Sequence, residues 1–369
     1  MNIGFDAKRA FFNKTGLGNY SRSLITALHS FFPENTYQLF TPLFKENLLF
    51  PEIQNCEDIQ IIHPSRFLPQ SIWRSWGITK SFNNTDIYHG LSAELPLGKI
   101  PLNTKLVVTI HDLIYERFPE LYPRIDYAIY RKKTINACAK AHRIIAVSEQ
   151  TKRDLIRFYG IEALKINVVY QDCHPMFLER YSEPEKAVFK KKYNLPEQFL
   201  LNLGTLEERK NALLILKAMI HLPDDIHLVL VGKDTPYKEK LIAFIHKNQL
   251  TNRVHFRPEI NFLEFPLLYQ SASVFIYPSI FEGFGIPVLE AIKSQVPVIA
   301  ATGSCLEEAG GADSIFIHPE DALSLKENIL LLLNDKAIRA RQIQKSFEYA
   351  LNFSSKNFAK KTMEVYKLL

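Results

Sequence analysis

Two adjacent cations, Arg209 and Lys210, lie where a short apolar strand pattern gives way to a helical one. The strand pattern covers Phe199–Leu203, and Gly204 supplies the turn that follows it. Cations at the start of a helix oppose its dipole, because the first turn of a helix favours anions. The pair therefore predicts a bound anion between the two side chains. A diphosphate fits, since arginine grips phosphate oxygens bidentately and lysine adds a compact charge.

A second cluster follows the strand pattern Val274–Pro278, where a glycine-rich turn leads into another helix. Glu282 precedes the turn and Glu290 lies on the helix. Gly283 and Gly285 allow the backbone to approach a ligand closely and offer N–H groups to phosphate or sugar oxygens. An ionised carboxylate only accepts hydrogen bonds. The two glutamates therefore suit hydroxyl groups, one on a sugar ring and the other on a ribose.

These two stretches resemble the donor-site signatures of family 4 retaining glycosyltransferases of GT-B architecture. The resemblance is carried by Gly204-Thr205 with Arg209-Lys210-Asn211, and by Glu282-Gly283-Phe284-Gly285-Ile286-Pro287 with Glu290. It extends over most of the chain. The resemblance implies an α/β fold with two Rossmann-like, parallel-sheet domains that face each other across a central cleft.

The front of the chain resembles the same family in two further places. Residues 14–20, which contain Gly16 and Gly18, resemble the glycine loop that approaches the donor phosphates. Residues 107–112 resemble the strand whose terminal histidine, here His111, reaches the transferred sugar. His89 also ends a strand pattern, and we rank it below His111 as a candidate site residue.

Carried over residue by residue, the resemblance implies four catalytic residues. Arg209 and Lys210 would neutralise the diphosphate leaving group, Glu282 would contact the donor sugar, and His111 would hydrogen-bond that sugar near the reacting centre. Glu290 would hold the nucleotide ribose. The residues predicted to bind the nucleotide sugar are Gly16, Gly18, Gly204, Arg209, Lys210, Gly283, Phe284, Gly285, Ile286, Val288, Leu289 and Glu290.

No cofactor and no metal ion is expected. The sequence has no Asp-x-Asp metal motif, and the family resemblance implies a metal-independent transfer that retains the anomeric configuration. Two departures from the family pattern are visible. Residues 171–174 replace the usual turn before the hinge, and Arg257-Pro258 stands where a glycine is usual, which leaves recognition of the base open.

Short β-branched runs alternate with longer helical patterns along the chain, which predicts βα units and parallel sheets. A proline-containing segment at about 174–185 separates two sets of strands. We therefore predict an acceptor domain, residues 1–175 joined by helix 353–369, and a donor domain, residues 176–352. The expected strands are Ile3–Ala7, Tyr37–Thr41, Ile59–His63, Asp86–His89, Leu106–Ile110, Ile144–Ser148 and Asn167–Tyr170, then Phe199–Leu203, His227–Val231, Val254–Arg257, Val274–Pro278, Val296–Ala300 and Ile315–His318.

Length and composition agree with two globular domains, since the chain has 369 residues of which 47% are hydrophobic. The N-terminus lacks the regions of a signal peptide, and no apolar run approaches the roughly 18 residues that cross a bilayer. The four cysteines are widely spaced, which favours reduced thiols. We expect a cytoplasmic enzyme.

Between Arg124 and Arg157 lies a group of basic residues, most of which follow Tyr122, Tyr127 and Tyr130. This pattern suits peripheral contact with an anionic membrane, at its inner face, or a phosphate-bearing acceptor. A solvated helix face is the alternative interpretation. Nucleic acid is not an expected partner, because no nucleic-acid-binding module accompanies the charge.

The motifs most resemble those of bacterial mannosyltransferases, so GDP-mannose is the expected donor and UDP-glucose the alternative. A glycan or a lipid-linked glycan of a surface polysaccharide is the expected acceptor. Other GT-B enzymes, namely a phosphorylase or an epimerase, remain alternatives, as does a catalytically silent sugar-nucleotide binding protein. A dinucleotide dehydrogenase ranks last, because Gly16 and Gly18 do not continue into a G-x-G-x-x-G turn.

Overall fold

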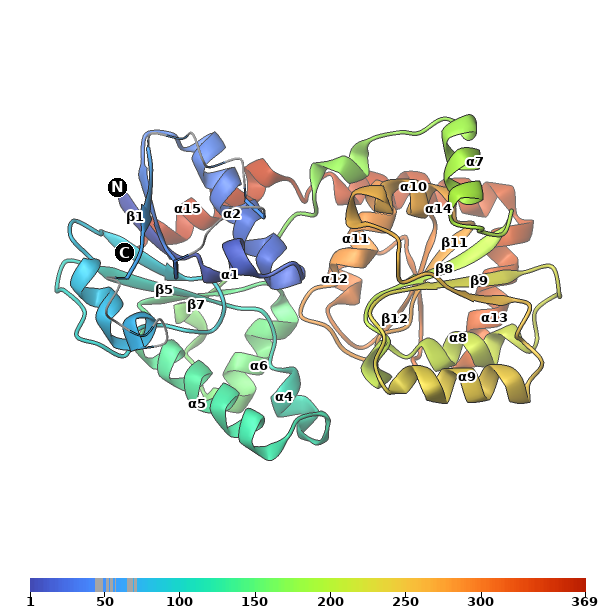
Figure 1. The fold of residues 1–369 in the computed structure, drawn as a ribbon, viewed down its shortest axis with the longest axis horizontal. Coiled ribbons are helices and arrows are strands. Elements are labelled where there is room, and N and C mark those ends of the chain that lie inside the picture. The colour runs from blue at the N-terminus through green and yellow to red at the C-terminus, as the bar shows by residue number, and fades with distance from the viewer. Residues whose placement is uncertain (44–48, 51–52, 54–55, 57, 65–68, 70–71) are drawn as a thin grey trace. The chain divides into compact units, whose positions relative to one another are not determined.

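The computed structural model describes every residue except 44–48, 51–52, 54–55, 57, 65–68 and 70–71. The chain divides into two compact units (Figure 1). Unit 1 comprises Met1–Asp172 and Phe353–Leu369, and unit 2 comprises Cys173–Asn352. The sequence had placed the first division after residue 175, a few residues further along.

Unit 1 contains a sheet in which all described strand pairs are parallel. Its strands are β1 (Asn2–Asp6), β2 (Thr36–Phe40), β3 (Ile59–Ile62), β4 (Ile87–Gly90), β5 (Lys105–Ile110), β6 (Arg143–Ala146) and β7 (Ile166–Val168). The order across the described sheet is β3-β2-β1-β4-β5-β6-β7. The direction of winding therefore reverses between β1 and β4, which is the place where such sheets bind ligands.

Helices cover both faces of this sheet, so its strands are buried on both sides and consist of nearly continuous apolar residues (Figure 1). The helices of unit 1 are α1 (Lys8–Phe12), α2 (Gly16–Phe31), α4 (Ile114–Arg117), α5 (Arg124–Lys140), α6 (Glu149–Tyr159) and α15 (Ser355–Tyr366). A π-helical turn at Trp73–Gly77 lies between β3 and β4.

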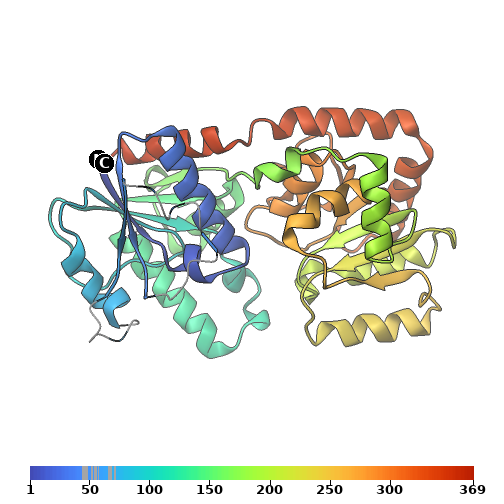
Figure 2. The ribbon, with the colours of Figure 1, turned by 45° about the horizontal axis from the view of Figure 1, so that its top comes forward.

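The last helix, α15, lies beside α2 in unit 1 (Figures 1 and 2). Its buried face places Phe358 against Tyr20, with 5.5 Å between the ring centroids. Near its end, the hydroxyl of the buried Tyr366 lies 2.7 Å from Nδ1 of His89. The apolar face of α15 thus completes the hydrophobic core of unit 1.

Unit 2 repeats the architecture with the described strand order β10-β9-β8-β11-β12-β13, again with parallel pairs. Its strands are β8 (Phe199–Leu203), β9 (His227–Val231), β10 (Val254–Phe256), β11 (Val274–Tyr277), β12 (Val298–Ala301) and β13 (Ile315–Ile317). Its helices are α7 (Glu183–Lys192), α8 (Ala212–Met219), α9 (Tyr237–Lys247), α10 (Phe265–Ser271), α11 (Ile286–Lys293), α12 (Leu306–Gly310), α13 (Ala322–Asn334) and α14 (Lys336–Ala350). Here the winding reverses between β8 and β11.

Each strand expected from the sequence overlaps a strand of the structure, and the predicted class of two α/β units with parallel sheets is confirmed. The core of unit 2 is formed by apolar residues of β8, β9 and β11 packed against α8 and α13. In the part of the chain that the structure describes, no helix is long and apolar enough to span a membrane.

Candidate active site

The candidate site of unit 2 lies at the carboxyl ends of β8 and β11, the two strands between which the winding reverses. Gly204 follows β8, and its N–H donates to the carbonyl of Val231. Arg209 and Lys210 lie in a short 3-10 turn, one residue before α8 begins. The sequence had suggested that the two cations lie in the first turn of the helix. In the structure they precede the helix.

The carboxylate of Glu282 lies between these two cations. Its Oε1 atom is 2.5 Å from Nζ of Lys210 and 3.0 Å from Nη1 of Arg209. The same oxygen accepts hydrogen bonds from the hydroxyls of Ser279, at 2.6 Å, and Tyr277, at 3.1 Å. We call these five residues the Glu282 cluster. It brings together three of the four predicted catalytic residues.

Burial by itself raises the pKa of Glu282, but Lys210 and Arg209 outweigh burial and lower the pKa to about 2. The group is therefore a carboxylate at neutral pH. It occupies the position between the two cations where the sequence predicted an external anion. Every hydrogen bond and ion pair given for it within the described chain falls on Oε1, which leaves Oε2 able to accept from a ligand.

Other contacts fix the two cations in place. Arg209 donates from Nη2 to the carboxylate of Glu207 at 2.5 Å, and from Nη1 to the carbonyl of Phe281. Nζ of Lys210 donates to the hydroxyl of Tyr277 at 2.6 Å and lies 5.0 Å from the centre of its ring. The charges are thus held in position before any ligand arrives, which is what electrostatic stabilisation of a developing charge requires.

The glycine-rich turn places Gly285 at φ +110°, a conformation that side chains with a Cβ rarely adopt. A Cβ there would also lie 2.7 Å from Cδ2 of Leu306. Gly285 caps α11, and its carbonyl accepts from the amides of Val288 and Leu289. Within the described residues, the amides of Gly285 and Ile286 have no acceptor, so this helix start can receive an anion.

Three of the predicted donor-binding side chains, those of Phe284, Val288 and Leu289, are buried in unit 2. They pack in the interior of unit 2 and so support the turn and the first part of α11. Any contact they make with a ligand must therefore use the backbone of this turn rather than their side chains.

Glu290 lies on α11 and is nearly completely buried. Its Oε2 atom accepts a hydrogen bond of 2.9 Å from the hydroxyl of Tyr269. Burial raises the pKa of Glu290 to about 7, and the hydrogen bond from Tyr269 only partly opposes this rise. The two predicted glutamates thus differ in protonation, because Glu282 has two cations beside it, whereas among the residues that the structure describes no cation contributes to the pKa of Glu290.

His111 belongs to unit 1, where it follows β5. Its Nε2 atom lies 2.9 Å from the carbonyl oxygen of Leu91. A carbonyl only accepts, so Nε2 carries the proton and Nδ1 is the atom that can accept from a ligand. Burial lowers the pKa of His111 to about 4, a shift that the Leu91 carbonyl opposes and Arg9 increases. The ring is therefore neutral at physiological pH.

His89 is fully buried and both of its ring nitrogens are engaged. Nδ1 lies 2.7 Å from the hydroxyl of Tyr366, and Nε2 lies 2.8 Å from that of Thr109. Thr109 in turn lies 3.0 Å from the hydroxyl of Tyr20. His89 therefore joins β4 to α15 and, through Thr109, to α2 in the core.

The glycine loop at the start of α2 contains two glycines in different surroundings. Gly16 is exposed, and a Cβ there would meet nothing within 4 Å. A Cβ at Gly18 would lie 1.9 Å from the carbonyl oxygen of Asn13. Gly18 thus has a packing role in the loop, whereas Gly16 leaves the helix start open.

Sequence reasoning missed three residues of the site. Tyr277 and Ser279 belong to the Glu282 cluster, and their place within five residues of Glu282 was the available signal. Tyr269, the partner of Glu290, lies 21 residues away from it with no local pattern to mark it. In the described ranges, no three His, Cys, Asp or Glu side chains gather in a way that could hold a metal ion.

Two family descriptions match this chain. "Glycosyltransferase Family 4" matches residues 16–171, and "Glycosyl transferases group 1" matches residues 184–349. O-antigen chain mannosyltransferase B of Escherichia coli is 28% identical over 319 residues, which are 85% of this chain and 80% of that protein. O-antigen chain mannosyltransferase RfbU of Salmonella typhimurium is 24% identical over 325 residues, 85% of this chain and 86% of its own.

Solved structures show the same fold. Anabaena Alr3699/HepE in complex with UDP and glucose has a TM-score of 0.77 at 17% identity, with 100% of both chains covered. WaaG, a glycosyltransferase involved in lipopolysaccharide biosynthesis, has a TM-score of 0.73 at 17% identity, with 99% of both chains covered. The fold and the family matches together define a glycosyltransferase with the GT-B fold. This chain belongs to glycosyltransferase family 4, and its sequence resembles bacterial mannosyltransferases.

Proposed function

We propose that this enzyme transfers a hexose from a nucleoside diphosphate sugar to a glycan or lipid-linked acceptor during polysaccharide synthesis, at the cytoplasmic side of a membrane. The observation that carries the proposal is the Glu282 cluster at the switch point of unit 2. It holds two fixed cations where the strands of such a sheet offer a ligand site. GDP-mannose is the first candidate donor, because the relatives reported above are O-antigen mannosyltransferases.

UDP-glucose is the second candidate donor. It is favoured by the likeness to Anabaena Alr3699/HepE, which has been solved in complex with UDP-glucose. The two donors differ in both base and sugar, and the contacts of Arg257 do not separate them. That residue donates to the backbone carbonyls of Tyr193 and Asn194, so it acts in the structure of unit 2 rather than as an evident base contact.

In the proposed reaction, negative charge accumulates on the diphosphate as the anomeric bond breaks. Lys210 and Arg209 stabilise this charge, and the amides of Gly285 and Ile286 add their dipoles. Because Glu282 already neutralises the cations, a diphosphate has to share them with that carboxylate. Oε2 of Glu282 then accepts a hydrogen bond from a hydroxyl of the donor sugar. The carboxylate that pairs with the cations in the free enzyme thus also contacts the substrate.

His111 contacts the transferred sugar in this proposal through Nδ1, which accepts from a sugar hydroxyl while Nε2 donates to Leu91. Glu290 binds the two ribose hydroxyls. The transfer retains the anomeric configuration and needs no metal ion, because Arg209 and Lys210 provide the positive charge beside the leaving group.

A screen against GDP-, UDP- and ADP-sugars tests the proposal. The matching donor should raise the melting temperature, since a ligand that binds only the folded state stabilises it. NMR of the product should show the donor's anomeric configuration, and a chelator should leave the rate unchanged. Stabilisation by no sugar nucleotide would count against a donor site, and an inverted product would contradict the retaining mechanism.

Peripheral binding to an anionic membrane is a further part of the proposal, and α5 is the element that supports it. On this helix Ile125 is 75% exposed, Ile129 and Tyr130 are also exposed, and Arg124 and Lys132 lie in solvent beside them. Exposed apolar side chains among cations suit a headgroup region with negative lipids.

Sedimentation with vesicles of phosphatidylcholine and phosphatidylglycerol measures this binding. We expect binding to increase with the anionic fraction and to fall severalfold in Ile125→Ser. The matched control is Leu263→Ser, which removes a similarly exposed apolar side chain, 70% exposed, from unit 2. If neither the wild type nor the control sediments with anionic vesicles, α5 does not bind the membrane and the solvated helix face is the correct interpretation.

A further inference from the structure

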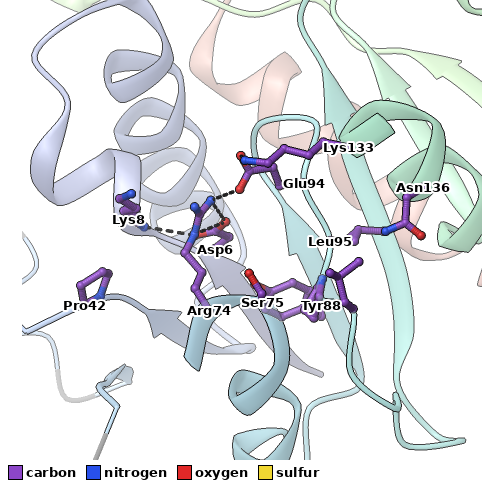
Figure 3. A pocket seen from close by; sticks show the side chains of 12 residues that line it. Asp6, Lys8, Pro42, Arg74, Ser75, Tyr88, Glu94, Leu95, Lys133 and Asn136 are labelled. Carbon is purple, nitrogen blue, oxygen red and sulfur yellow. Dashed lines mark hydrogen bonds and ion pairs between the residues drawn. The ribbon is translucent and has the colours of Figure 1, made fainter. Parts of the chain in front are cut away.

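Unit 1 contains a cavity of about 650 Å³ that none of the donor-site residues lines. It lies where β1 and β4 end, which is the switch point of the unit 1 sheet (Figure 3). Asp6 ends β1, Tyr88 lies in β4 and Glu94 follows β4. Ligands of doubly wound sheets bind at this kind of position. Because the Glu282 cluster lies at the switch point of unit 2, the cavity and the cluster occupy corresponding positions in the two sheets.

Five charged side chains line the cavity: Lys8, and four that form a network along one wall with alternating sign (Figure 3). Arg74 faces Asp6 with both Nε and Nη2, at distances of 3.1 Å and 2.5 Å from Oδ2. Nη2 of Arg74 also lies 2.7 Å from Oε2 of Glu94, whose Oε1 lies 3.0 Å from Nζ of Lys133. The network joins β1, the π-helical turn, the segment after β4 and α5, and so fixes the polar atoms in space.

The network leaves hydrogen-bonding capacity for a ligand. A carboxylate has about four acceptor positions, and each oxygen of Glu94 uses one of them for the ion pair given above. Lys133 is 51% exposed and has three donors, one of which points to Glu94. Asn136 and Ser75 add further polar groups to the lining. Donors and acceptors therefore alternate along the same wall.

This alternation favours hydroxyl groups over an anion. Each hydroxyl donates one hydrogen bond and accepts others, so neighbouring hydroxyls of a sugar ring can engage a carboxylate and a cation together. A phosphate accepts only, and would meet the carboxylates of Asp6 and Glu94 beside Arg74 and Lys133. Leu95 and Pro42 provide apolar surface in the lining, which suits the C–H face of a sugar ring.

The wall of the cavity is also connected to His111. The segment that carries Glu94 begins at Leu91, whose carbonyl accepts the hydrogen bond from His111 at 2.9 Å. Further along the segment, the amide of Ala93 donates to the carbonyl of Thr109, at 2.9 Å. One short segment thus touches both the histidine proposed to contact the donor sugar and the charged wall. A sugar in the cavity would lie on the same edge of the sheet as that histidine.

We infer that this cavity is the subsite for a neutral hexose residue of the acceptor, with Glu94 and Lys133 as the residues that select it. This inference rests on the proposed function, since it assigns the acceptor of the same reaction. It assigns acceptor specificity to a cavity lined by three cations and two carboxylates, which recognises hydroxyl groups rather than the phosphate of a lipid-linked acceptor.

The two tryptophans of the chain lie next to residues that line this cavity. Trp73 and Trp76 both belong to the π-helical turn that carries Arg74 and Ser75. Titration with the methyl α-glycosides of mannose, glucose and galactose should change the tryptophan fluorescence of the full chain for at least one sugar. Titration with inorganic phosphate and with octyl phosphate tests whether the cavity binds an anion instead. We expect no saturable change with either anion, and no competition with the sugar.

Glu94→Gln and Lys133→Gln should each raise the dissociation constant of the bound glycoside at least tenfold. Lys133 is half exposed, so the fold should survive its replacement. Glu120→Gln and Lys99→Gln make the same changes at exposed positions outside the cavity and should bind like wild type. Saturable binding of phosphate alone, no response to any of the three glycosides, or unchanged binding in both cavity variants would each overturn the inference.

Failure of this inference is separable from failure of the proposed function. If a sugar nucleotide supports transfer and Glu94→Gln leaves the KM for the acceptor unchanged, the cavity is not the acceptor subsite although the enzyme is a transferase. If glycosides bind as described but no sugar nucleotide stabilises the protein or supports transfer, the sugar site stands and the proposed reaction is wrong.

Discussion

The ammonium group of Lys210 lies 2.5 Å from the carboxylate of Glu282, and the guanidinium of Arg209 lies 3.0 Å from the same oxygen. In the free enzyme, Glu282 therefore serves as an internal counter-ion for Lys210 and Arg209. This arrangement keeps two partly buried positive charges compensated until a diphosphate arrives, because an unpaired buried charge is costly.

Lys210→Ala should reduce kcat by about 10²- to 10³-fold, which corresponds to the ~3 kcal/mol typical for removal of one preorganised group that stabilises a developing charge. Initial transfer rates at saturating donor measure the effect. Lys217→Ala, an exposed lysine on α8, is the matched control and should keep the wild-type rate. A variant at position 210 with near-normal turnover would remove Lys210 from the mechanism.

Glu290→Gln should stabilise the protein at alkaline pH. The folded pKa of about 7 lies above the ordinary value of 4.5, so the stability linked to protonated Glu290 is complete below pH 4.5 and is lost as pH rises through 7. The loss relative to the glutamine variant amounts to about 3 kcal/mol. Melting temperatures between pH 5 and 8.5 should diverge, whereas the exposed control Glu327→Gln should follow wild type. Parallel curves for wild type and Glu290→Gln would mean that Glu290 ionises normally.

Binding of a nucleoside diphosphate should release protons near pH 7. Ribose hydroxyls that donate to Glu290 favour its ionised form and lower its pKa, so a group that is about half protonated in the free enzyme loses that proton. Calorimetry in buffers of different ionisation enthalpy measures the release, which we expect to be about half a proton per site at pH 7. Glu290→Gln should abolish it. Equal binding enthalpies in all buffers for the wild type would show that Glu290 does not hold the ribose.

Gly18→Ala should destabilise the protein and Gly16→Ala should not. A methyl group at position 18 would collide with the carbonyl of Asn13, whereas position 16 is open. We expect a loss of about 1–3 kcal/mol for the first variant, the range of overpacking substitutions. Chemical denaturation of both variants provides the comparison. Equal stability of the two would show that the loop relaxes without cost.

The sequence predicted the strands well because fully buried parallel strands leave a local apolar signature, as in Phe199–Leu203. It also singled out Arg209, Lys210 and Glu282, since each follows a strand end and such ends meet at one edge of a parallel sheet. Their direct ion pairing was not foreseen, because an external anion was expected between the two cations, where Glu282 lies.

Other features depend on contacts between distant segments and leave no local pattern. Arg74 and Asp6 are 68 residues apart, and His89 meets Tyr366 across 277 residues. The raised pKa of Glu290 likewise comes from burial, which a helical pattern with a single glutamate does not reveal. Sequence reasoning therefore singled out three residues that the structure brings together, Arg209, Lys210 and Glu282, and missed the cavity of unit 1.

A crystal structure of the enzyme with its nucleoside diphosphate tests the central claim most directly. We expect diphosphate oxygens within about 3 Å of Nζ of Lys210 and of the Arg209 guanidinium, so that Glu282 is no longer the only anion beside the two cations. If the diphosphate binds elsewhere while the Glu282 ion pairs stay as they are in the free enzyme, the cluster is a structural element and the assignment of the donor site is wrong.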